Sequence, residues 1–502
     1  MQLLTVTEMA EADRLTIAGG TLGYELMKNA GRAVAEAAAD LVEEGLVIVV
    51  VGCGNNGGDG FVAAIELSRS GRDVVVMLVG DAASLRGDAA QAATDWKGPV
   101  LSGNAEAIRE IAAGTALFID ALLGAGLDRP VQGKTLQVIE ALNTSGVPIL
   151  AVDLPSGVHG TTGEVMGNAV CATETITFFR RKPGHFLLPG RMYCGQVRVA
   201  DIGISPDVLA DIRPATFENI PEFWERSFPV PGMDRHKYSR GHAVVVSGSK
   251  LSTGAARLAA RAALRGGAGL VTVASPSDAL AVNAAALTAV MLREVETPTD
   301  FATMLSDKRI TACVIGPGGG VDERMRSMVL EALRSGSGVV LDADALTVFE
   351  DDPDDLFEAI NSSKAGVVLT PHEGEFRRLF SFLKENSQYK SKLDWARAAA
   401  SRSHAVVLLK GPDTVIAAPD GRAVICANAP QWLATAGSGD VLSGVIGAML
   451  AQGVLAFEAA CIGAWIHGEA GREAGPGLIA EDLPEVFPAV YRRLYDYLAI
   501  DY

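Results

Sequence analysis

Positive charge is scarce in this chain relative to negative charge. The 502 residues contain 43 Lys and Arg against 60 Asp and Glu, which gives a formal net charge of −17 at pH 7. A general nucleic-acid-binding protein needs a basic surface to neutralise phosphates, so this balance argues against nucleic acid as a partner. A small anionic ligand is still compatible with the chain, because backbone dipoles can bind such a ligand locally.

Cysteines and long apolar runs are also in short supply. The six cysteines are scattered and show no C-x-x-C spacing, which indicates a reducing compartment. The N-terminal residues 1–15 lack a basic stretch followed by an apolar core, so no signal peptide is expected. No apolar stretch approaches the roughly 18 residues of a membrane helix. We therefore expect a soluble, cytoplasmic protein with no membrane partner.

Short β-branched runs alternate with Ala-rich helical stretches, which predicts α/β domains with parallel sheets. Two series of such strands are expected: 46–52, 74–80, 116–124 and 148–157, then 242–249, 269–276, 313–318, 338–346, 366–375 and 405–411. The Pro-rich stretch 204–234 separates the two series, so we expect two three-layer α/β/α domains, 1–215 and 225–502. An Asp-Gly pair predicts a hairpin over 414–426.

The most informative motif is the run Ala436–Asp440, AGSGD, which opens an apolar helix. A Gly-rich turn at a helix start presents unpaired N–H groups and the positive end of the helix dipole, which suits a phosphate. The Asp440 carboxylate is placed to take a proton from a hydroxyl that is being phosphorylated. The motif alone is also compatible with an ordinary capped turn.

Three further polar or Gly-rich segments follow strands in the second half: 316–318, 370–375 and 410–414. Each segment by itself is typical of a turn, a capping box or a loop. Together with Gly439 and Asp440 they predict one ligand site, because open α/β sheets bind ligands at the carboxyl ends of their strands. The residues alone do not separate this site from that of a small-alcohol kinase.

The motifs STGAARLAARAALRGGAGLVTVA, IGPG, LDADAL, TPHEGEF, KGPDT and AGSGDVLSG resemble the NAD(P)H-hydrate dehydratases of the ribokinase-like superfamily, over roughly residues 235–490. The resemblance implies a ribokinase-like fold, ADP as phosphoryl donor with release of AMP and phosphate, and Mg²⁺ on the nucleotide. It implies a nucleotide site at Lys410, Gly411, Pro412, Asp413, Thr414 and Gly439. It implies a site for the hydrated nicotinamide at Ala255, Gly318, His372 and Asp440.

In the first half, Gly52–Gly57 matches G-x-G-x-x-G directly after a strand, which is a weak dinucleotide signal. Asp120, Asp153 and Ser156 follow later strands, and with Asn56 they form a set of oxygen ligands. Such hard ligands suit an alkali or alkaline-earth cation rather than zinc. The alternative is that both aspartates cap the turns that follow them.

The motifs GCGNNGGDG, FIDALLGAGLDRP, VDLPSGVHGTTGEV and KPGH resemble the NAD(P)H-hydrate epimerases, over roughly residues 1–205. The resemblance implies a Rossmann-like fold, with potassium held by Asn56, Asp120 and Ser156. It implies that the hydrated nucleotide binds Asn55, Asn56, Gly57, Gly58, Asp59, Gly124, Ala125, Gly126, Leu127, Asp128, Arg129, Pro130 and Asp153. We take Asp153 as the candidate acid–base residue.

The two resemblances together predict a bifunctional repair enzyme. One domain would interconvert the R and S hydrates of NADH and NADPH, and the other would dehydrate the S form at the expense of ADP. A homo-oligomer, tetramer or octamer, is also expected from the resemblance. Two alternatives remain open: a kinase of a hydroxymethyl-bearing vitamin precursor, and an N-terminal domain that binds a ligand or partner without catalysis.

Overall fold

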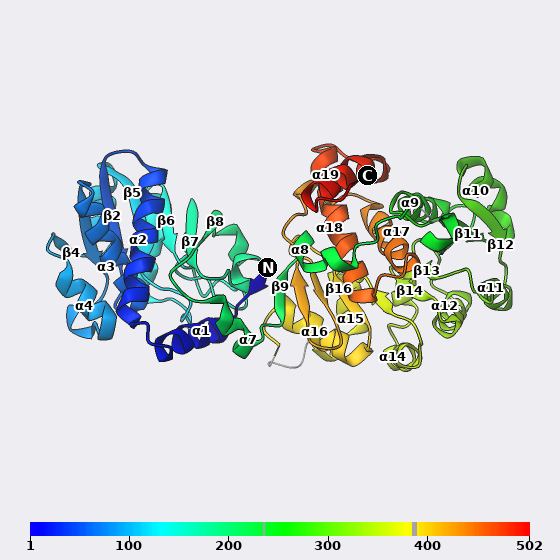
Figure 1. Cartoon of the computed structure of the whole chain (residues 1–502), viewed down its shortest axis with the longest axis horizontal. Coiled ribbons are helices and arrows are strands. Elements are labelled where there is room, and N and C mark those ends of the chain that lie inside the picture. The colour runs from blue at the N-terminus through cyan, green and yellow to red at the C-terminus, as the bar shows by residue number, and fades with distance from the viewer. Residues whose placement is uncertain (234–235, 384–388, 502) are drawn as a thin grey trace. The chain divides into compact units, whose positions relative to one another are not determined.

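The computed structural model divides into two compact units, Gln2–Thr216 and Phe217–Tyr502 with Met1 (Figure 1). It describes residues 1–233, 236–383 and 389–501. Within these ranges, no helix is both long and apolar enough to cross a membrane. The functional domains 1–215 and 225–502 stay predictions at this point, as does the linker 204–234, whose last residue lies outside the described ranges.

The first unit is built on a parallel sheet whose strand order reverses once. The order is β4 (Val100–Ser102), β3 (Val74–Leu78), β2 (Leu46–Val51), β5 (Thr115–Ala121), β6 (Ile149–Val152), β7 (Glu174–Phe178) and β8 (Gln196–Ala200). Every neighbouring pair is parallel. The chain builds outward from β2 to β4 and then returns to β5 on the other side of β2. This doubly wound order confirms the predicted Rossmann-like domain.

Helices cover both faces of this sheet. The helices of the unit are α1 (Val6–Ala18), α2 (Gly23–Leu41), α3 (Asn55–Arg69), α4 (Gly87–Asp95), α5 (Ala105–Ala112), α6 (Gly133–Thr144) and α7 (Leu209–Ile212). Residues of α2 and α3 share one buried cluster with the sheet, and residues of α5 and α6 share another. A Cβ on Gly31 would lie 2.4 Å from Val62 Cβ, so glycine lets α2 approach α3 closely.

The second unit contains a longer, mixed sheet. Its order includes β9 (Thr216–Glu218), β18 (Ala423–Ile425), β17 (Val415–Ala417), β16 (Val406–Leu409), β15 (Val367–Leu369), β14 (Gly338–Leu341), β13 (Ala312–Ile315), β10 (His242–Val246), β11 (Leu270–Ser275) and β12 (Met291–Glu294). The pairs from β12 to β16 are parallel. The predicted hairpin is confirmed, because β17 is antiparallel to both β16 and β18. The short strand β1 (Gln2–Leu3) belongs to the first unit by sequence.

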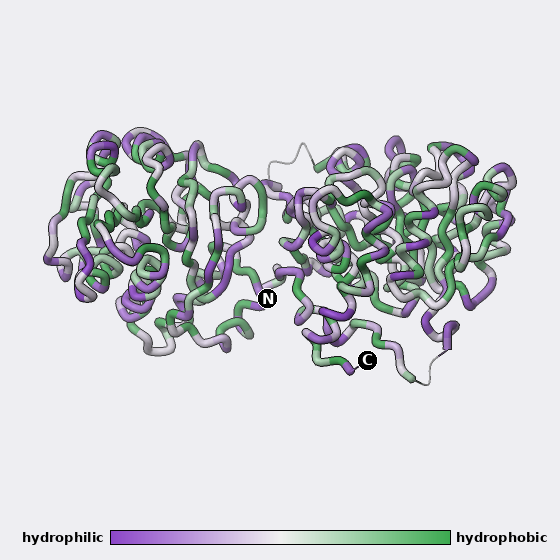
Figure 2. The backbone as a smooth tube through the Cα atoms, turned by 90° about the horizontal axis from the view of Figure 1, so that it is seen from above, coloured by the Kyte–Doolittle hydropathy of each residue, from purple (hydrophilic) through white to green (hydrophobic). Residues whose placement is uncertain are grey.

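Figure 1 shows α9, α17 and α18 on one face of this sheet and α12, α14 and α16 on the other, which confirms the predicted three-layer α/β/α domain. The helices are α8 (Pro221–Trp224), α9 (Thr253–Arg265), α10 (Leu280–Ala286), α11 (Pro298–Leu305), α12 (Glu323–Ser335), α13 (Asp344–Thr347), α14 (Pro353–Asn361), α15 (Glu373–Leu379), α16 (Lys392–Ser403), α17 (Ser438–Ala451), α18 (Ala456–Ala474) and α19 (Asp482–Tyr497). Within each unit, apolar stretches gather inside and hydrophilic ones lie mostly outside (Figure 2).

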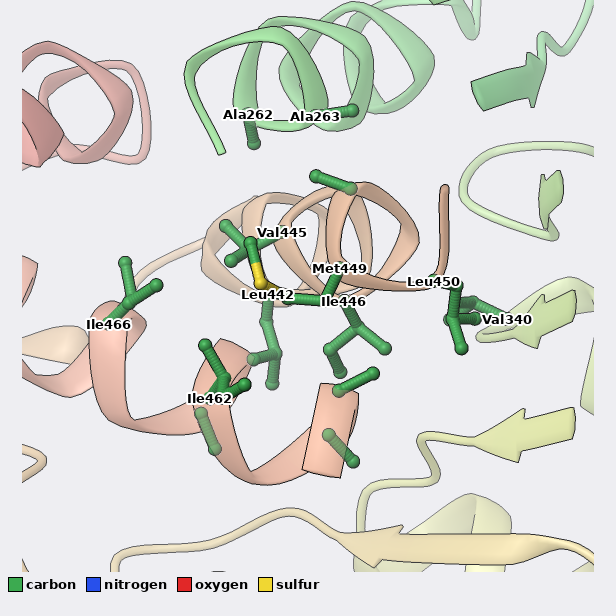
Figure 3. Close-up of a cluster of buried hydrophobic side chains, with 14 of the residues drawn as sticks. Ala262, Ala263, Val340, Leu442, Val445, Ile446, Met449, Leu450, Ile462 and Ile466 are labelled. Atoms are coloured by element: carbon green, nitrogen blue, oxygen red, sulfur yellow. The ribbon is translucent and has the colours of Figure 1, made fainter. Parts of the chain in front are cut away.

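The helix α17 lies at the centre of the core of the second unit (Figure 3). It is buried continuously from Val441 to Ala451, as expected for a helix that is apolar on all sides. A Cβ on Gly444 would lie 2.1 Å from the carbonyl oxygen of Ala259 in α9. A Cβ on Gly447 would lie 2.4 Å from a methyl group of Val314 in β13. Close packing on two sides therefore fixes the N-terminus of α17 at the carboxyl edge of the sheet.

Candidate functional sites

Each sheet has one point where the chain changes direction, and the predicted binding loops lie at these points. In the first unit the change falls between β2 and β5, which are followed by the predicted segments 55–59 and 124–130. In the second unit it falls between β10 and β13, which are followed by Ala255 and Gly318. A crevice forms at such points because neighbouring connections leave toward opposite faces of the sheet.

A cavity of about 750 Å³ opens at the switch point of the first unit. Ten of the predicted residues line it: Asn55, Asn56, Asp59, Gly124, Ala125, Gly126, Leu127, Asp128, Arg129 and Asp153. Gly57, Gly58 and Pro130 lie outside its wall. A Cβ on Gly57 would lie 2.0 Å from the carbonyl oxygen of Gly52, so this glycine lets the loop close on itself rather than forming the cavity surface.

Asp153 is held at the cavity by an ion pair that the sequence did not predict. Its Oδ1 accepts from Lys182 Nζ at 2.5 Å and from Thr177 Oγ1 at 2.8 Å, and the Lys182 side chain is 1% exposed. Burial alone would raise the pKa of Asp153, but the Lys182 ammonium lowers it below its usual range. Asp153 is therefore ionised, and its backbone is in the left-handed region with φ 64°.

The neutral imidazole of His185 holds the backbone of Asp153 and Lys182 in place through two hydrogen bonds. Its Nδ1 accepts from the backbone N–H of Lys182 at 2.9 Å, so its Nε2 carries the proton and donates to the carbonyl of Asp153 at 2.9 Å. Burial and the nearby Lys182 lower the pKa of His185 to about 4. The ring therefore positions the backbone on both sides of the ion pair and adds no charge to the site.

Two more carboxyl groups, Asp59 and Asp13, line the same cavity, and their pKa values are raised whereas that of Asp153 is lowered. Burial and the charge of Asp153 raise the pKa of Asp59 well above its ordinary value. Burial raises the pKa of Asp13, on α1, to about 6. The cavity thus combines an ionised carboxylate at Asp153 with a carboxyl group at Asp59 whose raised pKa favours the protonated form, a pattern typical of paired acid and base groups.

The predicted cation ligands meet around the loop Leu122–Gly124. Asp120 is fully buried, and its oxygens accept from Ser156 N at 2.8 Å, Ser156 Oγ at 2.6 Å and Leu122 N at 3.3 Å. Ser156 Oγ also accepts from Leu123 N at 2.8 Å. A Cβ on Gly124 would lie 3.0 Å from Asn56 Oδ1, which brings that amide to the same loop.

These residues fit a monovalent cation chemically. Burial raises the pKa of Asp120 to about 6, and no Lys or Arg among the described residues pairs with it. One carboxylate among neutral amide, hydroxyl and carbonyl oxygens is a donor set for a hard ion of low charge.

The site of the second unit is organised around the N-terminus of α17. No side chain caps this helix, whose N-cap is Gly437 with φ 85°. Lys410 Nζ bonds to Asp342 Oδ1 at 2.7 Å, and Ser443 Oγ donates to Asp342 Oδ2 at 2.6 Å. A Cβ on Gly439 would lie 3.5 Å from Lys410 Nζ. An ammonium group and uncapped backbone N–H groups therefore converge at one place.

Asp440 faces this group and is poised near neutrality. Burial raises its pKa to about 6, with a further rise from Asp342 and Asp344 and an opposing effect from Lys410. Although burial disfavours the charged form of Lys410, the Asp342 carboxylate raises the pKa of that ammonium. At pH 7 both Asp440 and Lys410 are therefore mainly ionised.

The first turn of α9, which carries Ala255, and the loop that carries Gly318 join the same edge. A Cβ on Gly318 would lie 3.3 Å from Ala255 Cβ, and a Cβ on Gly316 would lie 1.8 Å from the carbonyl oxygen of Asp342. Asp344 Oδ2 accepts from Gly320 N at 2.9 Å. The structure thus brings the loops after β10, β13 and β14 to the start of α17.

The remaining predicted residues have more local contacts. His372 is the N-cap of α15, and its Nδ1 accepts from the N–H groups of Gly374 and Glu375. In the segment Lys410–Thr414, Asp413 pairs with Lys392 at 2.7 Å and Thr414 Oγ1 donates to the Gly411 carbonyl at 2.7 Å. Pro412 is exposed at the tip of this turn. Asp413 and Thr414 therefore shape the loop, while Lys410 points to α17.

Several residues of these sites were missed at the sequence level: Asp13, Thr177, Lys182, Asp342 and Ser443. Lys182 and Asp342 lie inside motifs, KPGH and LDADAL, but nothing in the sequence pairs them with Asp153 and Lys410. Ser443 follows Gly439 by four residues, so helical spacing could have placed it on the same face of α17. Asp13 carries no sequence signal beyond its polar position on α1.

Comparisons with known proteins agree with this geometry in both halves. The family model described as NAD(P)H-hydrate dehydratase matches residues 243–483, and the model described as YjeF-related protein N-terminus matches residues 23–184. Bifunctional NAD(P)H-hydrate repair enzymes from Thermofilum pendens and Moorella thermoacetica are 37% and 36% identical to this chain. The alignments cover 93% and 98% of this chain and 92% and 97% of those proteins.

Among solved structures, the ADP/ATP-dependent NAD(P)H-hydrate dehydratase from Bacillus subtilis, co-crystallised with ATP/Mg²⁺, is 27% identical to this chain. It covers 55% of this chain and 98% of its own length, with a TM-score of 0.48. The similarity to bifunctional relatives extends over nearly the whole length of the chain. The chain belongs to the family of bifunctional NAD(P)H-hydrate repair enzymes.

Proposed function

We propose that this chain restores hydrated NADH and NADPH in two steps, with an epimerase in residues 1–215 and an ADP-dependent dehydratase in residues 225–502. The observation that carries the proposal is the similarity to bifunctional relatives over nearly the full length. The coupling has a chemical reason. A stereospecific dehydratase recovers one epimer only, so the other epimer must be converted before it can be repaired.

In the dehydratase, Asp440 is the proposed general base. It takes the proton of the ring hydroxyl while that oxygen attacks the β-phosphorus of ADP, and AMP leaves. Lys410 and the N–H groups at the start of α17 would stabilise the charge on the transferring phosphoryl group. The carbon–oxygen bond then breaks, phosphate departs, the ring nitrogen supplies its lone pair, and loss of a proton from the adjacent carbon restores the dihydronicotinamide.

Mg²⁺ bound to the nucleotide phosphates would supply additional positive charge during this transfer. Asp342 and Asp344 offer hard oxygen donors beside the start of α17. The proposed roles of Gly411 to Thr414 are structural support for Lys410 and contact with the nucleotide. Ala255 in the first turn of α9, Gly318 in the loop after β13 and His372 at the start of α15 would contact the hydrated nicotinamide.

In the epimerase, we assign Asp59 as general acid and Asp153 as general base. A protonated Asp59 would donate to the ring hydroxyl, which leaves as water as the ring nitrogen forms a double bond to carbon. Water then adds to the opposite face and gives its proton to Asp153, which forms the other epimer. Return of that proton from Asp153 to Asp59 through solvent restores both carboxyl groups, so the cycle has no net proton change. The different environments of the two carboxyl groups support these opposite roles.

Potassium is the proposed ion of the epimerase domain, held by Asn56, Asp120 and Ser156. It would compensate the buried Asp120 charge and fix the loop Leu122–Gly124, from which the segment Gly124–Pro130 continues to the substrate. Its role would be structural and electrostatic. A buried carboxylate without a cationic side chain is the observation that supports it.

The decisive test is recovery of NADH from a mixed-epimer hydrate by the purified chain, with ADP, with ATP or without nucleotide. Full recovery that depends on ADP is the expected result. Recovery that stops at the S fraction would make the N-terminal domain a binding module. A phosphorylated alcohol that accumulates without elimination would favour a kinase, and the Asp440→Asn variant serves as the inactive control.

A further inference from the structure

A second cavity, of about 670 Å³, runs beside α9 in the second unit. We call it the α9 groove; Gly254, Arg257, Arg261, Arg265, Leu287 and Glu481 are among its lining residues. The wall opposite α9 is formed by the end of α10 and the segment before β12. The helices α9 and α10 are neighbours in Figure 1. None of the residues predicted from the sequence lies in its wall.

Three arginines of α9 face this groove in a row. Their spacing of four residues puts Arg257, Arg261 and Arg265 on one side of the helix. Arg261 Nε and Arg265 Nη2 both bond to Glu485, at 2.7 Å and 3.2 Å. With Glu481 in the wall, three positive charges meet two negative ones, so the groove keeps a positive surplus in a chain of net charge −17.

Arg257 differs from the other two arginines of the row. In the described part of the chain no carboxylate pairs with it, and its Nε is buried without a hydrogen-bond partner. A buried guanidinium N–H that bonds to nothing costs free energy, so an acceptor at this position would be bound favourably. Guanidinium groups fit phosphate oxygens particularly well, because two parallel N–H groups can bond to one phosphate.

The groove begins at the proposed reaction site. Gly254 precedes Ala255, which lies against Gly318. Leu258, also in the groove wall, has its Cδ1 2.7 Å from where a Cβ on Gly437 would lie. From Gly254 the groove follows α9 as far as Arg265, and these twelve residues of α-helix span about 16 Å.

We propose that the α9 groove binds the phosphate-bearing adenosine half of the hydrated dinucleotide, with Arg257 bonded to a phosphate. The inference rests on the proposed dehydratase function and extends it to the non-reacting half of the substrate. With the hydrated ring at Asp440, the adenosine half must leave the site by some path, and the groove supplies one of suitable length and charge. Leu287 and Val290 offer an apolar wall for a flat base, and the volume lies in the usual range for ligand pockets of about 300–1,000 Å³.

Steady-state dehydration by the full chain at saturating ADP, with the S hydrates of NADH and NADPH as separate substrates, tests this proposal. For Arg257→Gln we expect KM to rise about ten-fold or more with kcat unchanged, because a charged hydrogen bond that forms equally in ground and transition states is lost. A rise for both substrates would identify the pyrophosphate as the bound group. A rise for the NADPH hydrate alone would identify the 2′-phosphate. Arg334→Gln, on the exposed side of α12, is the matched control and should leave both KM values unchanged.

A second variant moves KM in the opposite direction, which a folding defect cannot do. Glu481→Gln removes a negative charge from the groove wall and should lower KM about two- to three-fold at low salt, with a smaller effect at high salt. Unchanged KM values for both variants, or a loss of kcat alone in Arg257→Gln, would overturn the groove assignment while the repair activity stands. Absence of any NADH recovery by the wild-type chain would instead overturn the proposed function itself.

Discussion

Replacement of Asp440 by Asn should have two opposite effects, one on activity and one on stability. Removal of a general base that acts in the rate-limiting proton transfer costs about 100- to 10,000-fold in kcat. The amide preserves the size of the side chain and the start of α17. Nucleotide binding should therefore be largely retained, because Lys410 and the helix N-terminus are unchanged.

The stability effect follows from the raised pKa of Asp440. Folding raises this pKa from 3.8 to about 6, so the folded state disfavours the ionised form by roughly two pKa units, or at most about 3 kcal/mol. Because the side chain is partly open to solvent, screening reduces this to about 1–2 kcal/mol. Below pH 4 the carboxyl group is protonated in both states and Asn brings no gain. Above pH 6 it is ionised in both states and the gain is complete.

Tryptophan fluorescence during urea unfolding measures this difference well, since four of the five tryptophans lie in the second unit. The free energy of unfolding of Asp440→Asn should exceed that of the wild type at pH 7.5, and the two values should converge below pH 4. In the wild type, kcat/KM should fall about ten-fold per pH unit below pH 6. Asp344→Asn should shift this decrease of kcat/KM to lower pH, because the substitution removes a charge that raises the pKa of Asp440. Retained turnover in Asp440→Asn, or a stability gain that does not depend on pH, would refute the reasoning.

Three other substitutions test the packing and the first unit. Asp120→Ala should weaken the potassium dependence of epimerisation and leave dehydration unchanged. The epimerisation rate is measured against KCl concentration, with NaCl added to keep the ionic strength constant. An unaltered potassium response would contradict the ion site. Lys182→Met leaves the Asp153 charge unpaired and should lower the free energy of unfolding of the first unit by about 3–5 kcal/mol. The double variant with Asp153→Asn should regain much of this stability, as measured by thermal unfolding. Gly444→Ala forces α17 away from α9 and should cost about 1–3 kcal/mol, while Gly254→Ala, which meets no atom within 4 Å, should cost nothing.

The fold could be predicted from the sequence wherever strands are apolar on both faces. The run 46–52 contains β2, the run 313–318 overlaps β13, and the Asp-Gly pair marks the hairpin of β17 and β18. The strands β7 and β8 escaped prediction because their sequences, ETITF and QVRVA, alternate polar and apolar residues. In β7 the polar positions are used: Thr177 donates to Asp153, and Thr175 Oγ1 donates to the Cys194 carbonyl.

The candidate sites were predictable as loops but not as hydrogen-bonded networks. Motifs at strand ends identified the segments 55–59 and 410–414, because parallel strands bring their carboxyl ends to one edge. The ion pairs that set the charge of each site join residues 29 and 68 positions apart, Asp153 with Lys182 and Asp342 with Lys410. No local pattern encodes such a pair. The same holds for Asp413, whose side chain bonds to Lys392, a partner that its motif does not encode; its contact with the nucleotide stays a prediction.

The two sites differ in a way that matches the two proposed reactions. Epimerisation through loss and return of water needs a proton to be donated on one face and accepted on the other, without net consumption. Asp59 and Asp153 meet that need only if their protonation states differ, and the buried Lys182 beside one of them creates the difference. Phosphorylation needs only a base that is ionised at neutral pH, and Asp440 with a pKa of about 6 meets that need alone. Removal of the Lys182 charge would therefore take away the difference on which the proposed epimerisation depends and would leave the proposed dehydration unaffected.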